Sequence, residues 1–143
     1  MHAGLQLFET AHKQYFKQAL SEIKNGRKLT HWMWFIFPQI KGLGNSDLSK
    51  QYAIKDLEEA EAFIAHPVTG KNLIAIAAAL LQLKGANPTH IFGKPDDVKL
   101  QSCMTLFALV ANTNPVFEQV LYKFFNGKRD VKTIALLQAE LLE

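Results

Sequence analysis

Arg27-Lys28-Leu29-Thr30-His31-Trp32-Met33-Trp34-Phe35-Ile36-Phe37-Pro38-Gln39 is the stretch that decides how this chain folds. It holds both tryptophans of the chain and runs into a glycine turn at Gly42-Leu43-Gly44. Aromatic side chains of this size are costly to expose, since each can bury roughly 150–250 Å². The segment therefore forms either the centre of the core or the wall of a ligand pocket, and its sequence leaves both open.

The chain on both sides of this segment has a helical pattern. Apolar residues between Leu5 and Asn25 recur at the three-and-four spacing of one buried helix face, and Gly26 is placed to end that helix. Thr30 is expected to cap a short helix that Pro38 ends. A strand is the competing interpretation there, since Trp, Phe and Ile favour sheets, but no partner strand pattern occurs elsewhere.

The remaining sequence predicts further helices with loops between them. Asp56 and Asp130 are expected helix caps, and Asn114-Pro115 opens another helix. The expected helices cover residues 49–54, 56–65, 67–83, 97–111, 115–125 and 130–142, with turns at 39–47 and 87–97. The sequence thus predicts an all-α fold, a compact single-domain bundle of about seven helices over residues 1–143.

Composition favours one globular domain in the cytoplasm. Apolar residues make up 48% of the 143 positions and charged residues 20%. The longest apolar stretch without charge, Leu73 to Leu81, is far shorter than the ~20 residues of a membrane span, and no secretory leader is visible. The single cysteine, Cys103, agrees with a reducing compartment, and its apolar surroundings predict a buried filler. We therefore expect a cytoplasmic protein with no membrane partner, and the sequence does not define an oligomeric state.

The net charge of +3 is mildly basic and is concentrated in two clusters. Lys24, Arg27 and Lys28 form the first, and the second runs from Lys123 to Lys132. Both lie near expected helix C-termini, where cations interact favourably with the helix dipole. We favour that explanation over attraction of phosphate, and so do not expect a nucleic-acid partner.

Common cofactor and metal motifs are absent from the sequence. Gly42-Leu43-Gly44 lacks the third glycine and the preceding strand of a dinucleotide-binding loop, and no Walker lysine follows. There is neither a His-x-x-x-His pair nor a pair of cysteines, so no metal site and no cofactor is predicted.

Candidate site residues lie beside the aromatic segment and on the helix expected after Pro95. Trp32 and Trp34 are about 200° apart on a helix, so one is expected in the core and the other at a cleft. Asp97 is either an acidic helix-start residue or a functional carboxylate, and His31 either bonds locally or carries a proton. The candidate ligand-binding residues are Arg27, Trp34, Phe37, Gln39, Ser46, Lys99, Ser102 and Thr105.

Several motifs together resemble one bacterial family, catalogued as domain of unknown function 1810. They include His31–Gln39, Gly42-Leu43-Gly44-x-Ser46, Ile91-Phe92-Gly93, Ser102-x-Met104-Thr105-Leu106-Phe107 and Gly127-x-x-Asp130-x-x-Thr133. The resemblance covers about residues 5–140 and implies a compact helical domain of unassigned activity; nothing in the sequence supports the calpastatin label that some members carry. The order of residues from Met104 and Phe107 through Asn114-Pro115 to Asp130 is also similar to the C-terminal half of the NADAR superfamily, whose members act on ribose N-glycosidic bonds.

Three functions follow as hypotheses, the weakest of which is nonspecific nucleic-acid binding, which needs a continuous basic stripe and a salt-sensitive affinity. The first is a pocket for a nucleotide or ribosyl ligand, such as ADP-ribose, with possible N-glycosidase chemistry in which Asp97 supplies the carboxylate and His31 the proton donor. It predicts that His31, Asp97 and Ser102 converge on one cavity. The second is a non-enzymatic interaction or regulatory domain, which predicts a wholly buried aromatic motif and a large exposed apolar patch.

Overall fold

The computed structural model describes residues 3–141, and over this range the chain forms nine helices. Their order is α1 (Ala3–Lys24), α2 (Met33–Ile36), α3 (Asp47–Gln51), α4 (Leu57–Ala65), α5 (Thr69–Gln82), α6 (Pro88–Phe92), α7 (Asp96–Ala108), α8 (Val116–Phe125) and α9 (Val131–Leu141). The only β-type pairing among the described residues is a single parallel bridge between Ile40 and Ile54. The predicted all-α class is therefore confirmed.

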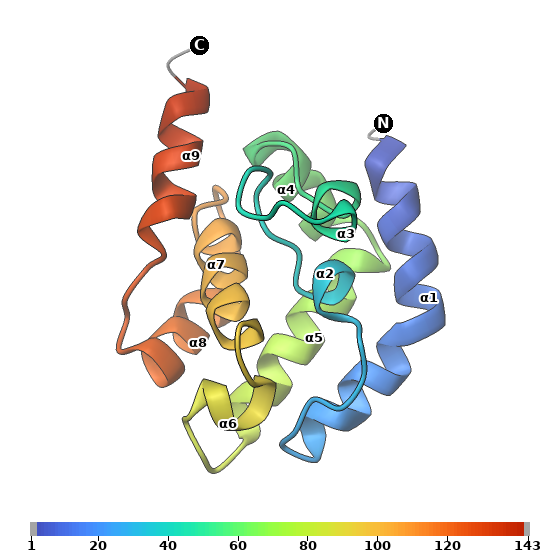
Figure 1. Cartoon of the computed structure of the whole chain (residues 1–143), viewed down its shortest axis with the longest axis vertical. Coiled ribbons are helices and arrows are strands. Elements are labelled where there is room, and N and C mark those ends of the chain that lie inside the picture. The colour runs from blue at the N-terminus through green and yellow to red at the C-terminus, as the bar shows by residue number, and fades with distance from the viewer. Residues whose placement is uncertain (1–2, 142–143) are drawn as a thin grey trace.

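Helix α5 crosses the middle of the bundle and packs against α1, α4 and α8 (Figure 1). Helix α7 lies beside α8 and also contacts α4, α6 and α9. Helices α1 and α9 flank the bundle on opposite sides (Figure 1). This arrangement leaves the short helices α2 and α3 and their connecting loop on the face between α1 and α7.

A row of phenylalanines joins four helices through the core. Phe8 of α1 meets Phe63 of α4 edge to face, with ring centroids 5.3 Å apart. Phe63 contacts Phe107 of α7, which contacts Phe117 of α8 at 5.7 Å. All four side chains are fully buried, and aromatic contacts of this kind add about 0.5–1.5 kcal/mol each beyond area burial.

Most predicted helix ends are confirmed. Asp56 caps α4 through its bond from the Glu59 amide, and Asn114 accepts from the Val116 amide at the start of α8. Gly26 follows α1 with φ +80°, a conformation that glycine adopts without strain.

Three local predictions were wrong. Thr30 does not cap α2, because its hydroxyl donates to Glu22, and α2 begins only at Met33. Ser46, not Ser49, opens α3 by accepting the Ser49 amide proton. The predicted turn at 87–97 contains α6, which Asn87 caps and Pro88 begins.

No single helix in the described part of the chain is long and apolar enough to cross a membrane; α4 and α5 meet the length and composition only as a pair bent by 84°.

Candidate functional site

A cavity of about 210 Å³ opens between α2, the start of α7 and the start of α9. We call it the Trp34 cavity; it is lined by Trp34, Gln39, Leu43, Gly44, Pro95, Val98, Lys99, Ser102, Asp130 and Lys132. Two further hollows adjoin it, one sharing Trp34 and Gln39 and the other sharing Leu43 and Lys132. The Trp34 cavity and these two hollows therefore form one continuous depression, and Leu43 lines all three.

The two tryptophans have separate roles, as their spacing predicts. Trp32 is 1% exposed and belongs to the core, where its ring contacts Phe37 and Phe92. Trp34 is only partly buried and forms one wall of the cavity. The aromatic segment therefore contributes to both the core and a pocket wall.

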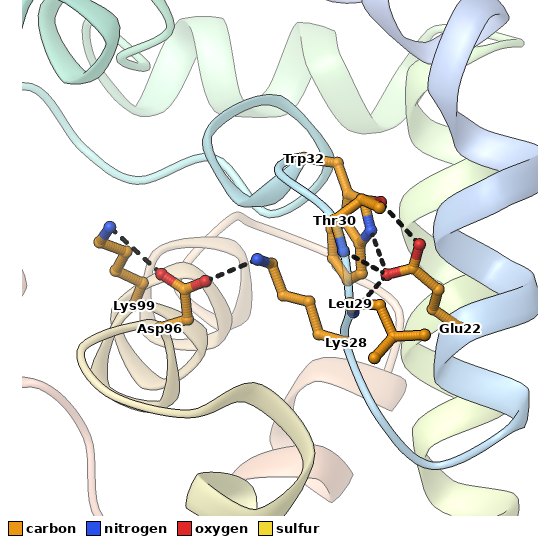
Figure 2. Close-up of polar contacts among 7 residues, drawn as sticks. All are labelled: Glu22, Lys28, Leu29, Thr30, Trp32, Asp96 and Lys99. Carbon is orange, nitrogen blue, oxygen red and sulfur yellow. Dashed lines mark hydrogen bonds and ion pairs between the residues drawn. The ribbon is translucent and has the colours of Figure 1, made fainter.

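A buried carboxylate fixes the chain just before the two tryptophans. The Glu22 side chain accepts hydrogen bonds from the backbone amides of Leu29 and Thr30, the Thr30 hydroxyl, the Gln18 amide and the Trp32 indole N–H. Figure 2 shows these bonds, other than the one from Gln18, converging on the carboxylate from the strand-like segment beside α1. Burial raises the pKa of Glu22, but these donors outweigh burial and lower the pKa to about 2.

Lys99 is held over the face of Trp34. Its Nζ lies 3.6 Å from the ring centroid and 3.3 Å from Asp96 Oδ1. The other Asp96 oxygen pairs with Lys28 Nζ at 2.9 Å, so Asp96 bridges the two lysines (Figure 2). The ammonium of Lys99 is therefore positioned by both an aromatic face and a carboxylate, and Lys99 lines the cavity.

Asp130 supplies a carboxylate to the cavity. Its Oδ2 caps α9 by accepting from the amide and hydroxyl of Thr133, at 3.2 and 2.5 Å, and it also accepts from the Ser102 hydroxyl at 2.9 Å. Its backbone amide donates to Thr105 Oγ1 at 2.9 Å. These bonds tie the start of α9 to α7 and hold the carboxylate in one orientation, with all three side-chain bonds on the same oxygen.

Gly44 is required where the loop approaches α3. A Cβ at this position would lie 2.5 Å from Ser49 Cβ, closer than carbon atoms approach without a shift of the chain. The absence of a side chain lets the loop pack against Ser49 and places Leu43 beside Trp34.

The predicted catalytic pair does not converge on this cavity. His31 is exposed on the segment before α2 and is not among the lining residues. Asp97 is buried, and its oxygens accept from the Thr89 hydroxyl at 2.6 Å and the Val98 amide at 2.8 Å. Of the three residues expected to meet, only Ser102 lines the cavity, so that prediction of convergence was wrong.

The predicted ligand-binding residues divide into two groups. Trp34, Gln39, Lys99 and Ser102, from residues 34–39 and α7, meet at the Trp34 cavity. The other four do not line it. Phe37 is fully buried against Phe92, Thr105 is buried and bonded to Gln101 and Asp130, Ser46 caps α3, and Arg27 is exposed beyond the end of α1.

The site also contains residues that the candidate set omitted, chiefly Asp130 and Lys132. Asp130 is recognisable from sequence as a helix cap, but a cap pattern does not show what the carboxylate faces. Among the described residues, no three His, Cys, Asp or Glu side chains come close enough together to hold a metal ion.

Comparison with known proteins agrees with the motifs that surround this cavity. The sequence profile described as "Protein of unknown function (DUF1810)" matches residues 2–137. The chain belongs to the DUF1810 family. The NADAR likeness is not confirmed by these comparisons, and no curated protein matches the chain.

A solved structure shares the DUF1810 fold of this chain. It is the crystal structure of the conserved hypothetical protein Rv1873 from Mycobacterium tuberculosis, which is 42% identical with a TM-score of 0.91. The match covers 94% of this chain and 96% of that one. The similarity thus extends over essentially the whole helical domain.

Proposed function

We propose that this DUF1810 domain binds a small nucleotide or ribosyl phosphate ligand in the Trp34 cavity, and that it does so without hydrolysing it. The observation that carries the proposal is the convergence of Trp34, Gln39, Lys99 and Ser102 on one cavity from two segments of the chain, residues 34–39 and α7. Binding pockets of this kind combine apolar walls with a few placed polar groups.

Each lining group suits one part of such a ligand. The Lys99 and Lys132 ammonium groups would hold a phosphate, and Asp130 would accept from ribose hydroxyls, as acidic residues do in dinucleotide-binding sites. Gln39 would pair with polar base atoms, and Trp34 and Leu43 would contact its ring. The cavity, at about 210 Å³, is below the roughly 300–1,000 Å³ of drug-sized pockets, which favours a mononucleotide or smaller ligand.

Binding is favoured over N-glycosidase activity because the expected proton donor lies elsewhere. Hydrolysis of a ribosyl bond needs a carboxylate and a group that protonates the leaving base. Asp130 could serve as the carboxylate, but His31 does not line the cavity. The alternative of an interaction domain predicts a wholly buried aromatic motif, whereas Trp34 is partly exposed to the cavity.

A thermal-shift titration with AMP, ribose 5-phosphate, ADP-ribose, NAD and flavin mononucleotide tests the proposal. A ligand that binds only the folded state raises the melting temperature by mass action. We expect a concentration-dependent rise that Trp34→Ala and Lys99→Met abolish and that the exposed-lysine control Lys71→Met leaves intact. A flat response to all five compounds would favour the interaction domain, and release of free base from NAD would show hydrolysis instead.

A further inference from the structure

A second cavity, of about 390 Å³, lies where α1 and α5 end and α6 begins. We call it the Gly85 cavity; it is lined by Asn25, Gly26, Leu83, Lys84, Gly85, Asn87, His90 and Ile91. Its floor is apolar, since Ile91 is buried and Leu83 is partly buried. A Cβ added at Gly26 or Gly85 would meet no heavy atom within 4 Å, so both glycines face open space.

The surface around this cavity carries several exposed cations. Lys84 lines it, Lys24 and Arg27 flank it at the end of α1, and Lys94 follows α6. All four side chains are exposed, and in the described part of the chain none of them forms an ion pair. The segments that line or flank the cavity, residues 23–27 and 83–95, contain neither Asp nor Glu, and Asp96, which follows them, is paired with Lys28 and Lys99.

Compensation of helix dipoles does not account for these cations. The end of α5 is already served by Lys123 of α8, whose Nζ donates to the carbonyl oxygens of Leu80, Leu81 and Leu83. Lys84 is therefore not needed to bind the free carbonyl oxygens at the end of α5. The next question is which cations of the two basic clusters are bound within the fold and which are exposed.

Each basic cluster holds both engaged and exposed cations. In the second, Lys123 caps α5 and Arg129 pairs with Glu118 through two bonds of 2.8 Å, whereas Lys128 and Lys132 are exposed. In the first, Lys28 is held by Asp96, whereas Lys24 and Arg27 project from the surface. The exposed cations of the first cluster lie beside the Gly85 cavity, so we consider nucleic acid, which the sequence did not lead us to expect, as a partner of this surface.

We propose that the end of the bundle around the Gly85 cavity binds single-stranded nucleic acid. The phosphates would contact Lys24, Arg27, Lys84 and Lys94, which are spread over three loops and so suit a polyanion better than one phosphate group. One base would enter the cavity over Leu83 and Ile91. A single strand is required because a base stacked inside a duplex cannot enter a cavity. This inference is independent of the ligand proposed for the Trp34 cavity.

Fluorescence anisotropy with a labelled single-stranded RNA or DNA oligonucleotide tests the charge contacts. We expect affinity to fall steeply with salt, and Lys84→Glu and Arg27→Glu each to weaken binding about tenfold or more at low salt. Lys17→Glu, an equal charge reversal on the exposed side of α1, should have little effect. Circular dichroism confirms that each variant keeps its helical content.

A cavity-filling variant tests the base contact separately. Gly85→Leu adds a side chain into open space without changing charge, so it should weaken single-strand binding severalfold and leave weak duplex binding unchanged. No binding at low salt, equal binding of a polyglutamate peptide, equal loss in the Lys17→Glu control, or unchanged single-strand affinity in Gly85→Leu would each overturn the proposal.

Discussion

The indole N–H of Trp32 donates to the Glu22 carboxylate at 3.0 Å, and both side chains are buried. The same carboxylate binds the Leu29 and Thr30 amides, so one acidic residue of α1 orients the segment that leads into α2. A charge buried this way is stable only because its donors are in place.

Glu22→Gln should therefore destabilise the fold strongly. The amide keeps the shape of the side chain but loses the charge and replaces one acceptor by a donor that faces other donors. The pKa difference between the usual 4.5 and about 2 corresponds to about 3 kcal/mol of stabilisation at neutral pH. Urea unfolding at pH 7 measures the loss, and exposed Glu61→Gln on α4 is the control, for which a change below about 0.5 kcal/mol is expected.

Stability should fall in two stages as the pH is lowered. Burial lowers the pKa of His12 to about 4, so the unfolded chain, with the usual value of 6.5, binds the proton first and stability falls between pH 6.5 and 4. The depressed pKa of Glu22 then removes its contribution as the pH falls from 4.5 towards 2. Urea midpoints across this range should show both stages, and Glu22→Gln should abolish only the second. A pH-independent midpoint between 6.5 and 4 would contradict the account of His12.

The two tryptophans should differ sharply in their effect on stability. Trp32→Phe removes the bond to Glu22 and leaves a gap in a fully buried site, so we expect a loss of about 2–4 kcal/mol. Trp34→Phe, at the cavity wall, should cost less than about 1 kcal/mol. Guanidinium unfolding followed by circular dichroism compares them, and equal losses would refute the separation into core and pocket wall.

Lys123→Met should weaken the end of α5. The ammonium donates to three carbonyl oxygens at that end, and bonds to a charged donor contribute about 1.5–3 kcal/mol. Hydrogen exchange should show faster opening of the last turn of α5, together with a lower unfolding midpoint. Lys128→Met, whose side chain is exposed, is the matched control, and a comparable effect there would show that general charge is responsible.

Helix class and most helix ends could be predicted because their signals are local. Gly26, Asp56 and Asn114 end or begin helices through contacts within a few residues. The start of α2 could not be predicted in this way. Thr30 has the residue type of a cap, but a carboxylate eight positions earlier binds its hydroxyl, and spacing gives no sign of that competition.

Residues of the site could be predicted only where the 3.6-residue period of a helix determines which way a side chain points. The spacing of Trp32 and Trp34 separated them. Of the three polar candidates on α7, Lys99 and Ser102 line the cavity, whereas Thr105 is buried and bonded to Asp130. Asp97 lies at the start of the same helix but turns towards Thr89 of α6, a helix that the sequence did not indicate. Asp130 reaches the cavity through the packing of α9 on α7, which is a tertiary relationship with no local signal.

The bridge between Ile40 and Ile54 separates the loop at residues 41–53 from the helices on either side of it. Two backbone bonds of 2.8 Å, from the Lys41 amide to the Ile54 carbonyl and from the Ile54 amide to the Gln39 carbonyl, close the base of the loop at residues 41–53, and both isoleucines are buried. Within this loop Tyr52 packs on Phe8 and Phe35 of the core, whereas Lys41, Asn45 and Ser46 are exposed. Since Leu43 and Gly44 of the same loop line the Trp34 cavity, substitutions in its exposed part should change the shape of the cavity while the helices keep their packing.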